Sequence, residues 1–257
     1  MNCIVCVASV PDTASVIKIG PDGKGIDETG IKWIVSPTDE YALEEAIKLT
    51  EDKGGEVTVV TYGPASAEAA LRDCLARGAH QAVHVLGGEK TLGDSFTIAK
   101  VLAGVIKDRE FDLVLCGIKG VGTDCSQVGQ MLAELLDIPH VAGIIELEVG
   151  DGSLAAGRDV EGGREKIECP MPALLTCQKG LNEPRLPSLP NIMKAGMKPQ
   201  ETVTCADLGI EVPANLVEIK LYSPPPARGA CKLVEAEEPA AAARELARLL
   251  NEEAKVI

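Results

Sequence analysis

The sequence has too little positive charge for a general nucleic-acid-binding protein. Its 25 Lys and Arg residues face 39 Asp and Glu residues, so the formal net charge is −14 at pH 7. No uniformly basic surface is then available to neutralise phosphates along a duplex. Apolar runs are also short, since none reaches the roughly 18 to 20 uncharged residues that a membrane span requires. The chain opens on a strand-like run at Met1-Asn2-Cys3 with no basic and apolar leader, so we expect a cytoplasmic protein.

Recognisable catalytic and metal-binding motifs are missing as well. The sequence contains neither a G-x-S-x-G elbow nor H-E-x-x-H, and no nucleophile and base pair stands out. We therefore assign no catalytic residue. The three histidines, His80, His84 and His140, lack ligand-like spacing, so we predict no metal site. Nine cysteines, an odd number without an evident signal peptide, indicate reduced thiols instead of a disulfide framework.

Most cysteines and surface charges have simple structural interpretations. Cys3 and Cys6 have C-x-x-C spacing, but residues three apart in a strand point to opposite faces, so a metal or redox pair is not expected there. We interpret the other seven, at positions 74, 116, 125, 169, 177, 205 and 231, as buried small apolar residues. The interleaved charges of Asp39–Asp52 and Pro239–Lys255 are interpreted as solvated faces of amphipathic helices.

The apolar content of 46% is enough for a sizeable core, and its pattern predicts the fold class. Strand-like runs at Cys3–Val10, Val57–Tyr62, Ala82–Leu86 and Leu113–Cys116 alternate with helix-like segments at Asp39–Thr50, Ser66–Arg77, Ser95–Lys107 and Cys125–Leu136. This alternation predicts an α/β fold, with an open, mostly parallel, Rossmann-like sheet covered by helices on both faces. Further strands at Ile144–Val149, Ser153–Asp159 and Ala173–Thr176 should finish or edge that sheet.

The last part of the chain has a different character. Gly180–Pro199 is punctuated by prolines, so we expect a loop that does not begin as a regular helix and that reaches outward. Its leucines, Leu186 and Leu189, suit a docking peptide, although a loop that packs back on its own domain is an equal alternative. A final helix is expected at about Pro239–Glu253. The predicted division is an α/β nucleotide-binding domain at 1–179 and the loop with an extended C-terminal arm at 180–257.

The strongest local signal for binding is the segment Leu113–Gly129, which reads as a strand, a Gly-bearing turn and a helix. Such a turn presents backbone N–H groups to an anion, and ligands of open parallel sheets bind beyond the carboxyl ends of the strands. Thr123, Ser126 and Gln127 can add side-chain hydrogen bonds. The spacing matches neither G-x-G-x-x-G nor a Walker loop, so an ordinary βα turn with a helix cap is an equal alternative. At the first helix, Ser36 is expected to act as the N-cap, followed by Pro37.

Several longer stretches, in this order and spacing, closely resemble the electron-transfer flavoprotein β subunits. They are Val10-Pro11-Asp12-Thr13, Ser36–Ala46, Gly63-Pro64, the Gly-bearing turn, Asp159–Glu165, Pro170–Thr176, Gly180–Ala195 and Asp207-Leu208-Gly209. The resemblance therefore spans nearly the whole chain. It implies electron carriage from flavin dehydrogenases, such as acyl-CoA dehydrogenases, to a redox acceptor. It also implies a heterodimer with an α subunit that holds most of an FAD, and a second nucleotide in this chain, either AMP or another FAD.

The resemblance also assigns residues to these roles. The implied nucleotide-binding residues are Cys6, Ser36, Pro37, Thr38, Asp39, Tyr62, Gly117, Ile118, Lys119, Gly120, Val121, Gly122, Thr123, Asp124, Cys125, Ser126, Gln127 and Val128. The implied docking residues for the dehydrogenase are Leu186, Leu189, Pro190, Ile192 and Met193, with Leu189 as the anchor.

Two questions stay open at this point. Asp39 and Val128 resemble members that bifurcate electrons from NADH with a second FAD, whereas Cys125, Gln130 and Met131 resemble AMP-binding members. The sequence therefore admits an electron-carrier subunit, a bifurcating flavoenzyme subunit with NADH-linked activity, or a stand-alone nucleotide-sensing α/β protein. The docking signature argues against the third.

Overall fold

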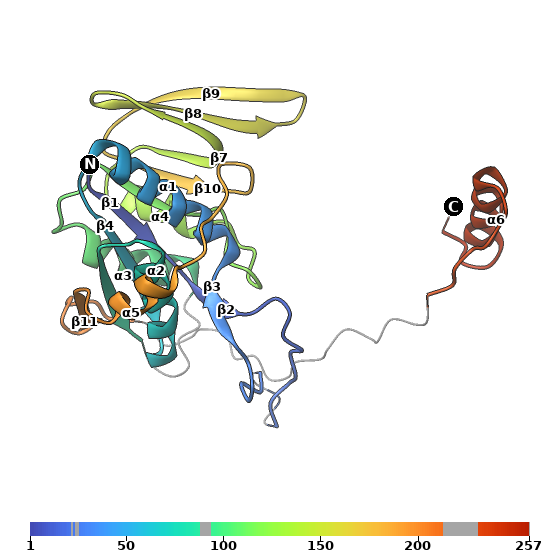
Figure 1. The fold of residues 1–257 in the computed structure, drawn as a ribbon, viewed down its shortest axis with the longest axis horizontal. Coiled ribbons are helices and arrows are strands. Elements are labelled where there is room, and N and C mark those ends of the chain that lie inside the picture. The colour runs from blue at the N-terminus through green and yellow to red at the C-terminus, as the bar shows by residue number, and fades with distance from the viewer. Residues whose placement is uncertain (22, 24–25, 88–93, 213–230, 257) are drawn as a thin grey trace. The chain divides into compact units, whose positions relative to one another are not determined.

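The computed structural model describes residues 1–21, 23, 26–87, 94–212 and 231–256. Its central element is a sheet with the strand order β11-β5-β4-β1-β6-β10-β7-β8-β9 (Figure 1). The strands are β1 Cys3–Cys6, β4 Val57–Gly63, β5 Gln81–Leu86, β6 Leu113–Gly117, β7 His140–Val149, β8 Ser153–Val160, β9 Gly163–Pro170, β10 Ala173–Cys177 and β11 Gln200–Thr204. From β11 to β7 every neighbouring pair is parallel, and only β8 and β9 extend the sheet in antiparallel fashion. The predicted mostly parallel α/β sheet is thus confirmed.

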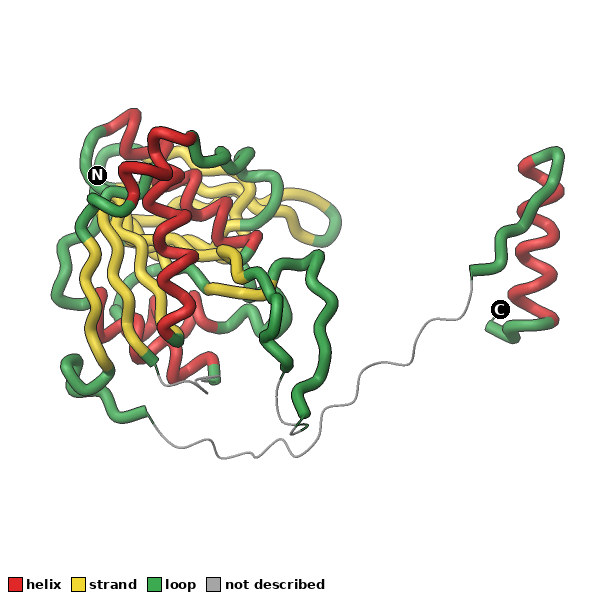
Figure 2. The backbone as a smooth tube through the Cα atoms, turned by 60° about the horizontal axis from the view of Figure 1, so that its bottom comes forward, coloured by secondary structure: helices red, strands yellow, loops and turns green. Residues whose placement is uncertain are grey.

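Helices cover both faces of this sheet, as the sequence predicts (Figure 2). They are α1 Pro37–Lys53, the 3-10 turn η1 Ala65–Ala67, α2 Glu68–Arg77, α3 Ser95–Ile106 and α4 Val128–Leu135. The helices α1 and α2 pack with one set of strand side chains, among them Val5 and Leu115. The helices α3 and α4 pack with the other set, among them Ile4 and Val114. Alternate residues of one strand thus pack into two separate cores, and Cys3 and Cys6 lie on opposite faces of the sheet.

Several element boundaries differ from the sequence prediction. The run Cys3–Val10 divides after Cys6, and Ser9–Pro11 forms β2, which pairs with β3, Trp33–Val35, in a separate two-stranded sheet. The strands β9 and β11 were not predicted. The helix expected from Cys125 begins only at Val128.

The Pro-punctuated segment does not begin as a regular helix, as predicted, but it contains one further along. A short helix, α5, spans Leu189–Ala195. Ser188 caps it by accepting a hydrogen bond from the Asn191 amide at 3.4 Å, and Pro190 lies within the first turn, where its missing N–H costs nothing.

The chain forms two compact units, Met1–Ile17 with Asp27–Ile219, and Lys18–Ile26 with Lys220–Ile257. The first holds the sheet, its covering helices and α5. The second holds α6, Pro239–Glu252, close to the predicted range. None of the α6 residues is buried, in keeping with the predicted solvated helix face. The predicted functional division at residue 180 stays a prediction, and residues 213–230 of that part lie outside the described residues.

Candidate functional site

The candidate nucleotide site lies where the direction of the chain across the sheet reverses. From β1 the chain proceeds through β4 and β5 on one side, then crosses to β6 on the other side of β1. Ligands of doubly wound sheets bind at such a switch point, beyond the carboxyl ends of the strands. Here Cys6 and Cys116 are register partners near the ends of β1 and β6, and Gly117 is the last residue of β6.

Asp39, in the first turn of α1, ties these strand ends together. Its carboxylate accepts hydrogen bonds from the backbone amides of Ala8, at 2.8 Å, and Gly117, also at 2.8 Å. Burial raises the pKa of the Asp39 carboxyl to about 7, although the two backbone hydrogen bonds act in the opposite direction. We call this arrangement the Asp39 brace. It fixes the start of α1 against the segment after β1 and the end of β6.

Neighbouring residues of the helix start continue the brace. The Thr38 hydroxyl donates to the Lys119 carbonyl oxygen at 2.5 Å, and its oxygen lies 3.3 Å from the Ser36 hydroxyl. Ser36 is the N-cap residue of α1, as predicted, but its side chain makes no capping hydrogen bond. A Cβ at Gly117 would lie 2.4 Å from both Asp39 Oδ1 and Thr38 Oγ1, which explains why only glycine fits there.

The turn that follows, from Lys119 to Gln127, is open. Gly122, Asp124 and Ser126 have φ values of +98°, +49° and +51°, in the left-handed region that favours glycine. Lys119 forms an ion pair with Asp124 at 3.0 Å. The side chains from Gly122 to Gln127 are exposed.

The backbone amides around the start of α4 are the groups that this turn offers to a ligand. Within the described part of the chain, the amides from Ser126 to Gln130 donate to no protein acceptor. The first amides of a helix have no partner in the helix, and together with the helix dipole they attract anions. An anionic group with several acceptor oxygens, such as a phosphate, fits this arrangement.

Two other residues assigned by resemblance lie on strands and not in the turn itself. Cys6 is buried, and burial raises the pKa of its thiol to about 12, so that it stays neutral near the Asp39 carboxyl. Tyr62 lies near the end of β4, partly buried in the core of α3 and α4. It hydrogen-bonds the Cys205 thiol. The structure thus brings Ser36, Thr38, Asp39, Gly117 and Lys119 into direct contact, and places Cys6 beside them.

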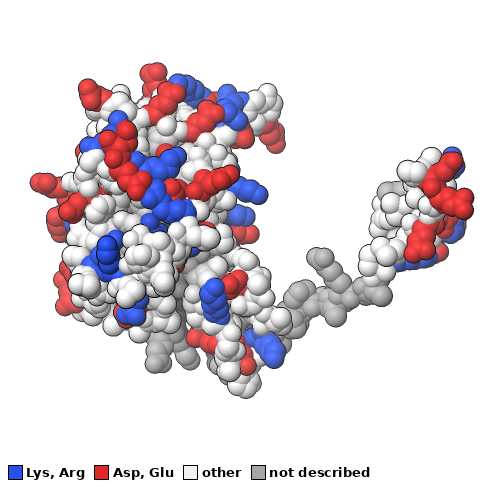
Figure 3. All heavy atoms as spheres, in the orientation of Figure 1, with Lys and Arg blue, Asp and Glu red and all other residues white. Residues whose placement is uncertain are grey.

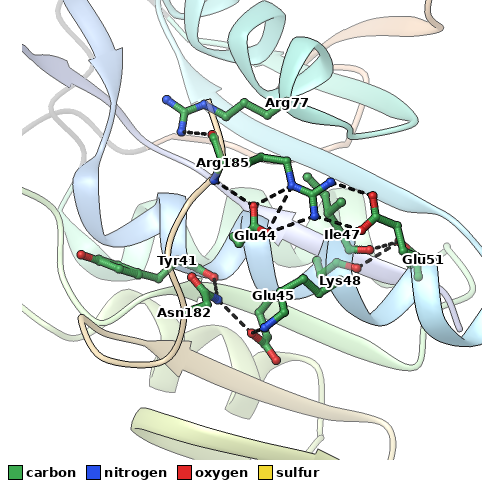
Figure 4. Close-up of polar contacts among 11 residues, drawn as sticks. Tyr41, Glu44, Glu45, Ile47, Lys48, Glu51, Arg77, Asn182 and Arg185 are labelled. Atoms are coloured by element: carbon green, nitrogen blue, oxygen red, sulfur yellow. Dashed lines mark hydrogen bonds and ion pairs between the residues drawn. The ribbon is translucent and has the colours of Figure 1, made fainter. Parts of the chain in front are cut away.

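The second candidate element is the segment 182–198, which we call the docking segment. Figure 4 shows Arg185 between two carboxylates of α1. Its guanidinium donates to both oxygens of Glu44, the closest at 2.9 Å, and to Glu51 at 2.6 and 2.9 Å. The hydrogen bonds that Arg185 donates to Glu51 and Glu44 raise the pKa of Arg185, and the same contact lowers the pKa of Glu51. The start of the docking segment is thereby held against α1.

Further contacts hold both ends of this segment. The Asn182 amide donates to the Tyr41 carbonyl oxygen at 3.0 Å and to Glu45 at 2.8 Å. At the far end, Lys198 donates to the carbonyl oxygens of Leu75 and Ala79 at 2.8 and 2.6 Å. These acceptors lie at the carboxyl end of α2, where a cation is favoured. Ala195 of α5 is fully buried in the core of α1 and α2.

Between these two anchors the apolar side chains face solvent. Leu186 and Leu189 are 84% and 72% exposed, and Ile192 and Met193 are also exposed. The surface over α5 is largely uncharged in Figure 3, whereas acidic and basic side chains are interspersed elsewhere on that face. The two alternatives drawn from the sequence therefore combine: the backbone packs on its own domain, and the apolar side chains point outward.

Sequence reasoning missed the acidic partners of this segment. The charges of Asp39–Asp52 were expected to form a solvated face, but Asp39, Glu44 and Glu45 are buried. A usable signal existed, because Glu44 and Glu51 are two helical turns apart and so share one face of α1. The prediction of buried cysteines is confirmed for positions 74, 116, 169 and 177, whereas Cys205 is only partly buried. It is wrong for Cys125 and Cys231, which are exposed.

The fold and the site first define a class, namely doubly wound α/β proteins with a turn of free backbone amides at the switch point. Comparison with known proteins is more specific. The model of the electron transfer flavoprotein domain matches residues 24–208. An electron transfer flavoprotein subunit beta from Bacillus subtilis is 45% identical over 260 residues, 100% of both chains. Those of Bos taurus and Homo sapiens are 34% and 35% identical, over 97% of this chain and 99% of each relative. The chain belongs to the electron transfer flavoprotein family, and its relatives are β subunits.

Two features are absent from the described residues. Among them, no helix is both long and apolar enough to cross a membrane. The same residues contain no group of three or more His, Cys, Asp or Glu side chains arranged to hold a metal ion.

Proposed function

We propose that the chain is the β subunit of a heterodimeric electron carrier that works with an α subunit and passes electrons from a flavin dehydrogenase to a redox acceptor. The observation that carries this proposal is the presence of two separate binding elements in one α/β unit. One is an open turn with free backbone amides, and the other is a firmly anchored segment with exposed apolar side chains.

In this proposal the turn Gly117–Val128 binds the phosphate of an adenine nucleotide, AMP or the AMP part of an FAD. The amides from Ser126 to Gln130 are the donors, and Lys119, which is ion-paired with Asp124 at 3.0 Å, lies in the same turn. Asp39 does not face the anion, since both its oxygens are engaged by the amides of Ala8 and Gly117. The residues present therefore fit an anionic ligand.

Electron carriage needs no nucleophile or general base in this chain, in keeping with the lack of a catalytic motif. The FAD of the complex supplies the redox chemistry when bound. The residues of this chain hold the second nucleotide through the turn and present Leu186, Leu189, Pro190, Ile192 and Met193 to the dehydrogenase. Burying one leucine in a partner pocket contributes about 1.5–3 kcal/mol before association costs, enough to decide a transient encounter.

The test is the nucleotide content of the complex. The chain is co-expressed with the α subunit from the same genome, the complex is isolated by size exclusion, and acid-released FAD and AMP are quantified per heterodimer. One FAD with one AMP supports the electron-carrier proposal. A stable monomer with no association would contradict it and favour a stand-alone nucleotide-binding protein.

A second outcome would change the assignment of the turn. Two FAD with no AMP would support a bifurcating subunit, which is the alternative that Asp39 and Val128 favour. Reduction of that complex by NADH would then be measured by flavin absorbance.

A further inference from the structure

We propose that Met193 and Met197 make the docking segment a site of reversible oxidation by hydrogen peroxide, and that sulfoxide formation there weakens docking of the dehydrogenase. The inference deepens the proposed docking function and rests on it. It concerns a modification of the chain's own side chains, with the nucleotide turn unaffected.

The inference rests on where the methionines lie in the structure. The chain has five, and the structure describes all of them. Met1, Met131 and Met171 are partly buried and pack against the two cores. Met193 and Met197 are 75% and 86% exposed. The two exposed thioethers of the chain thus both lie in the docking segment, where an oxidant in solution reaches them.

The same two residues lie in line with the predicted anchor. Leu189, Met193 and Met197 are spaced by four, so they share one face of a helix. Met197 lies just after α5, but its amide donates to the Lys194 carbonyl oxygen at 2.9 Å, which extends the turn. A partner that covers Leu189 therefore meets the two methionines next.

The chemistry is a two-electron oxygen transfer. The O–O bond of hydrogen peroxide breaks, an S–O bond forms at the thioether sulfur, and the peroxide is reduced to one water. The product is methionine sulfoxide, which is polar where the thioether is apolar, and which methionine sulfoxide reductases reverse. A sulfoxide gains less free energy than a thioether when an apolar partner surface covers it, because its polar oxygen must be desolvated.

The anchors of the segment make the expected effect local. Arg185 and Lys198 hold its ends through ion pairs and hydrogen bonds that involve neither methionine. The exposed side chains contribute little to the core. Oxidation is therefore expected to change the docking surface while leaving the fold and the nucleotide content intact.

The experiment uses the purified αβ complex with its FAD and a purified flavin dehydrogenase. The complex is treated with limiting hydrogen peroxide and then with a thiol reductant, which returns reversibly oxidised Cys125 and Cys231 to thiols but leaves sulfoxides. Peptide mass spectrometry maps the oxidised methionines. We expect selective oxidation of Met193 and Met197 and a KM for the complex raised by about tenfold, equivalent to about 1.4 kcal/mol. Methionine sulfoxide reductase should reverse the rise.

Matched variants make the result specific. In the double variant Met193→Leu with Met197→Leu, whatever its starting KM, peroxide should leave that KM unchanged. The control Met171→Leu should respond to peroxide as the wild type does. Full oxidation of both methionines with an unchanged KM would overturn the inference, as would an equal peroxide response in the double variant.

A parallel variant separates this inference from the function on which it rests. If Leu189→Ala leaves the KM unchanged, the docking segment is not the dehydrogenase site and the proposed function fails. If Leu189→Ala raises the KM but oxidation does not, the docking function stands and only the oxidation site is rejected.

Discussion

The turn Lys119–Gln127 and the docking segment are built in opposite ways. The turn is fixed at its base by the Asp39 brace, and the backbone amides from Ser126 to Gln130 are left free. The docking segment is fixed at both ends, by Arg185 and Lys198, and its apolar side chains are left free. The turn thus offers backbone donors, which suits the small anion proposed for it, whereas the docking segment satisfies its polar groups and offers apolar area, which suits the proposed protein partner.

The largest expected effect comes from filling the base of the turn. In Gly117→Val the new side chain would collide with Asp39 and Thr38, so the brace must break. We expect the complex to lose its second nucleotide and the β subunit to be destabilised by about 1–3 kcal/mol. Acid-released nucleotide and thermal unfolding measure both. Gly120→Ala is the control, because its Cβ meets only the flexible Thr123 hydroxyl, at 3.2 Å; equal loss there would contradict the assignment to the brace.

The next largest effect is expected from removing the predicted anchor of the docking segment. Leu189→Ala should lower kcat/KM for reduction by the dehydrogenase roughly tenfold, since one buried leucine contributes about 1.5–3 kcal/mol. Nucleotide content and melting temperature should not change, because the side chain is 72% exposed. Leu233→Ala, at a leucine that is 78% exposed outside the segment, is the matched control. Loss of nucleotide in Leu189→Ala would show that the segment supports the fold instead.

The third prediction tests how the docking segment is anchored. Arg185→Ala leaves the buried Glu44 carboxylate without its cation, which should destabilise the protein by about 1–3 kcal/mol after allowance for the partial exposure of Arg185. It should also weaken docking, because the segment is no longer pre-organised. The exposed pair of Arg72 with Glu68 provides the control: Arg72→Ala should leave both the melting temperature and the docking rate as they are.

The fourth prediction concerns the pH response of the brace. Since the folded-state pKa of Asp39 is raised from 3.8 to about 7, ionisation disfavours the fold. The free-energy cost of ionising Asp39 in the folded state is absent below about pH 4. It grows as the pH rises to about 7 and is constant above that pH. Asp39→Asn has no such titration. The melting temperature of the wild type should therefore fall relative to that of Asp39→Asn between pH 5 and 8, and parallel curves would contradict a buried, titrating Asp39.

The sequence predicted the sheet and the covering helices because each carries a clear apolar period, as in Val57–Tyr62 and Ser95–Lys107. It placed the docking leucines correctly on the surface. It missed β9, whose charged residues Arg164, Glu165 and Lys166 lie exposed on an edge strand with little apolar alternation. The predicted start of α4 is too early, because Asp124 and Ser126 adopt left-handed backbone conformations. The identities of these residues do not predict that conformation.

The brace and the anchors escaped prediction for a related reason. Asp39 contacts Gly117 across 78 positions, and Arg185 contacts Glu44 across 141. Local patterns report which residues share a helix face or a strand face, but they do not report which distant segments meet. Such contacts appear only when the sheet order brings α1 beside the end of β6 and beside the docking segment.

The most direct test of two separate binding elements is the amount of nucleotide released per αβ heterodimer from wild type, Leu189→Ala and Gly117→Val, measured side by side. The account predicts that Leu189→Ala retains the full wild-type content while Gly117→Val loses the nucleotide held by the β subunit. Equal retention in both variants, or equal loss, would contradict the separation of the turn from the docking segment.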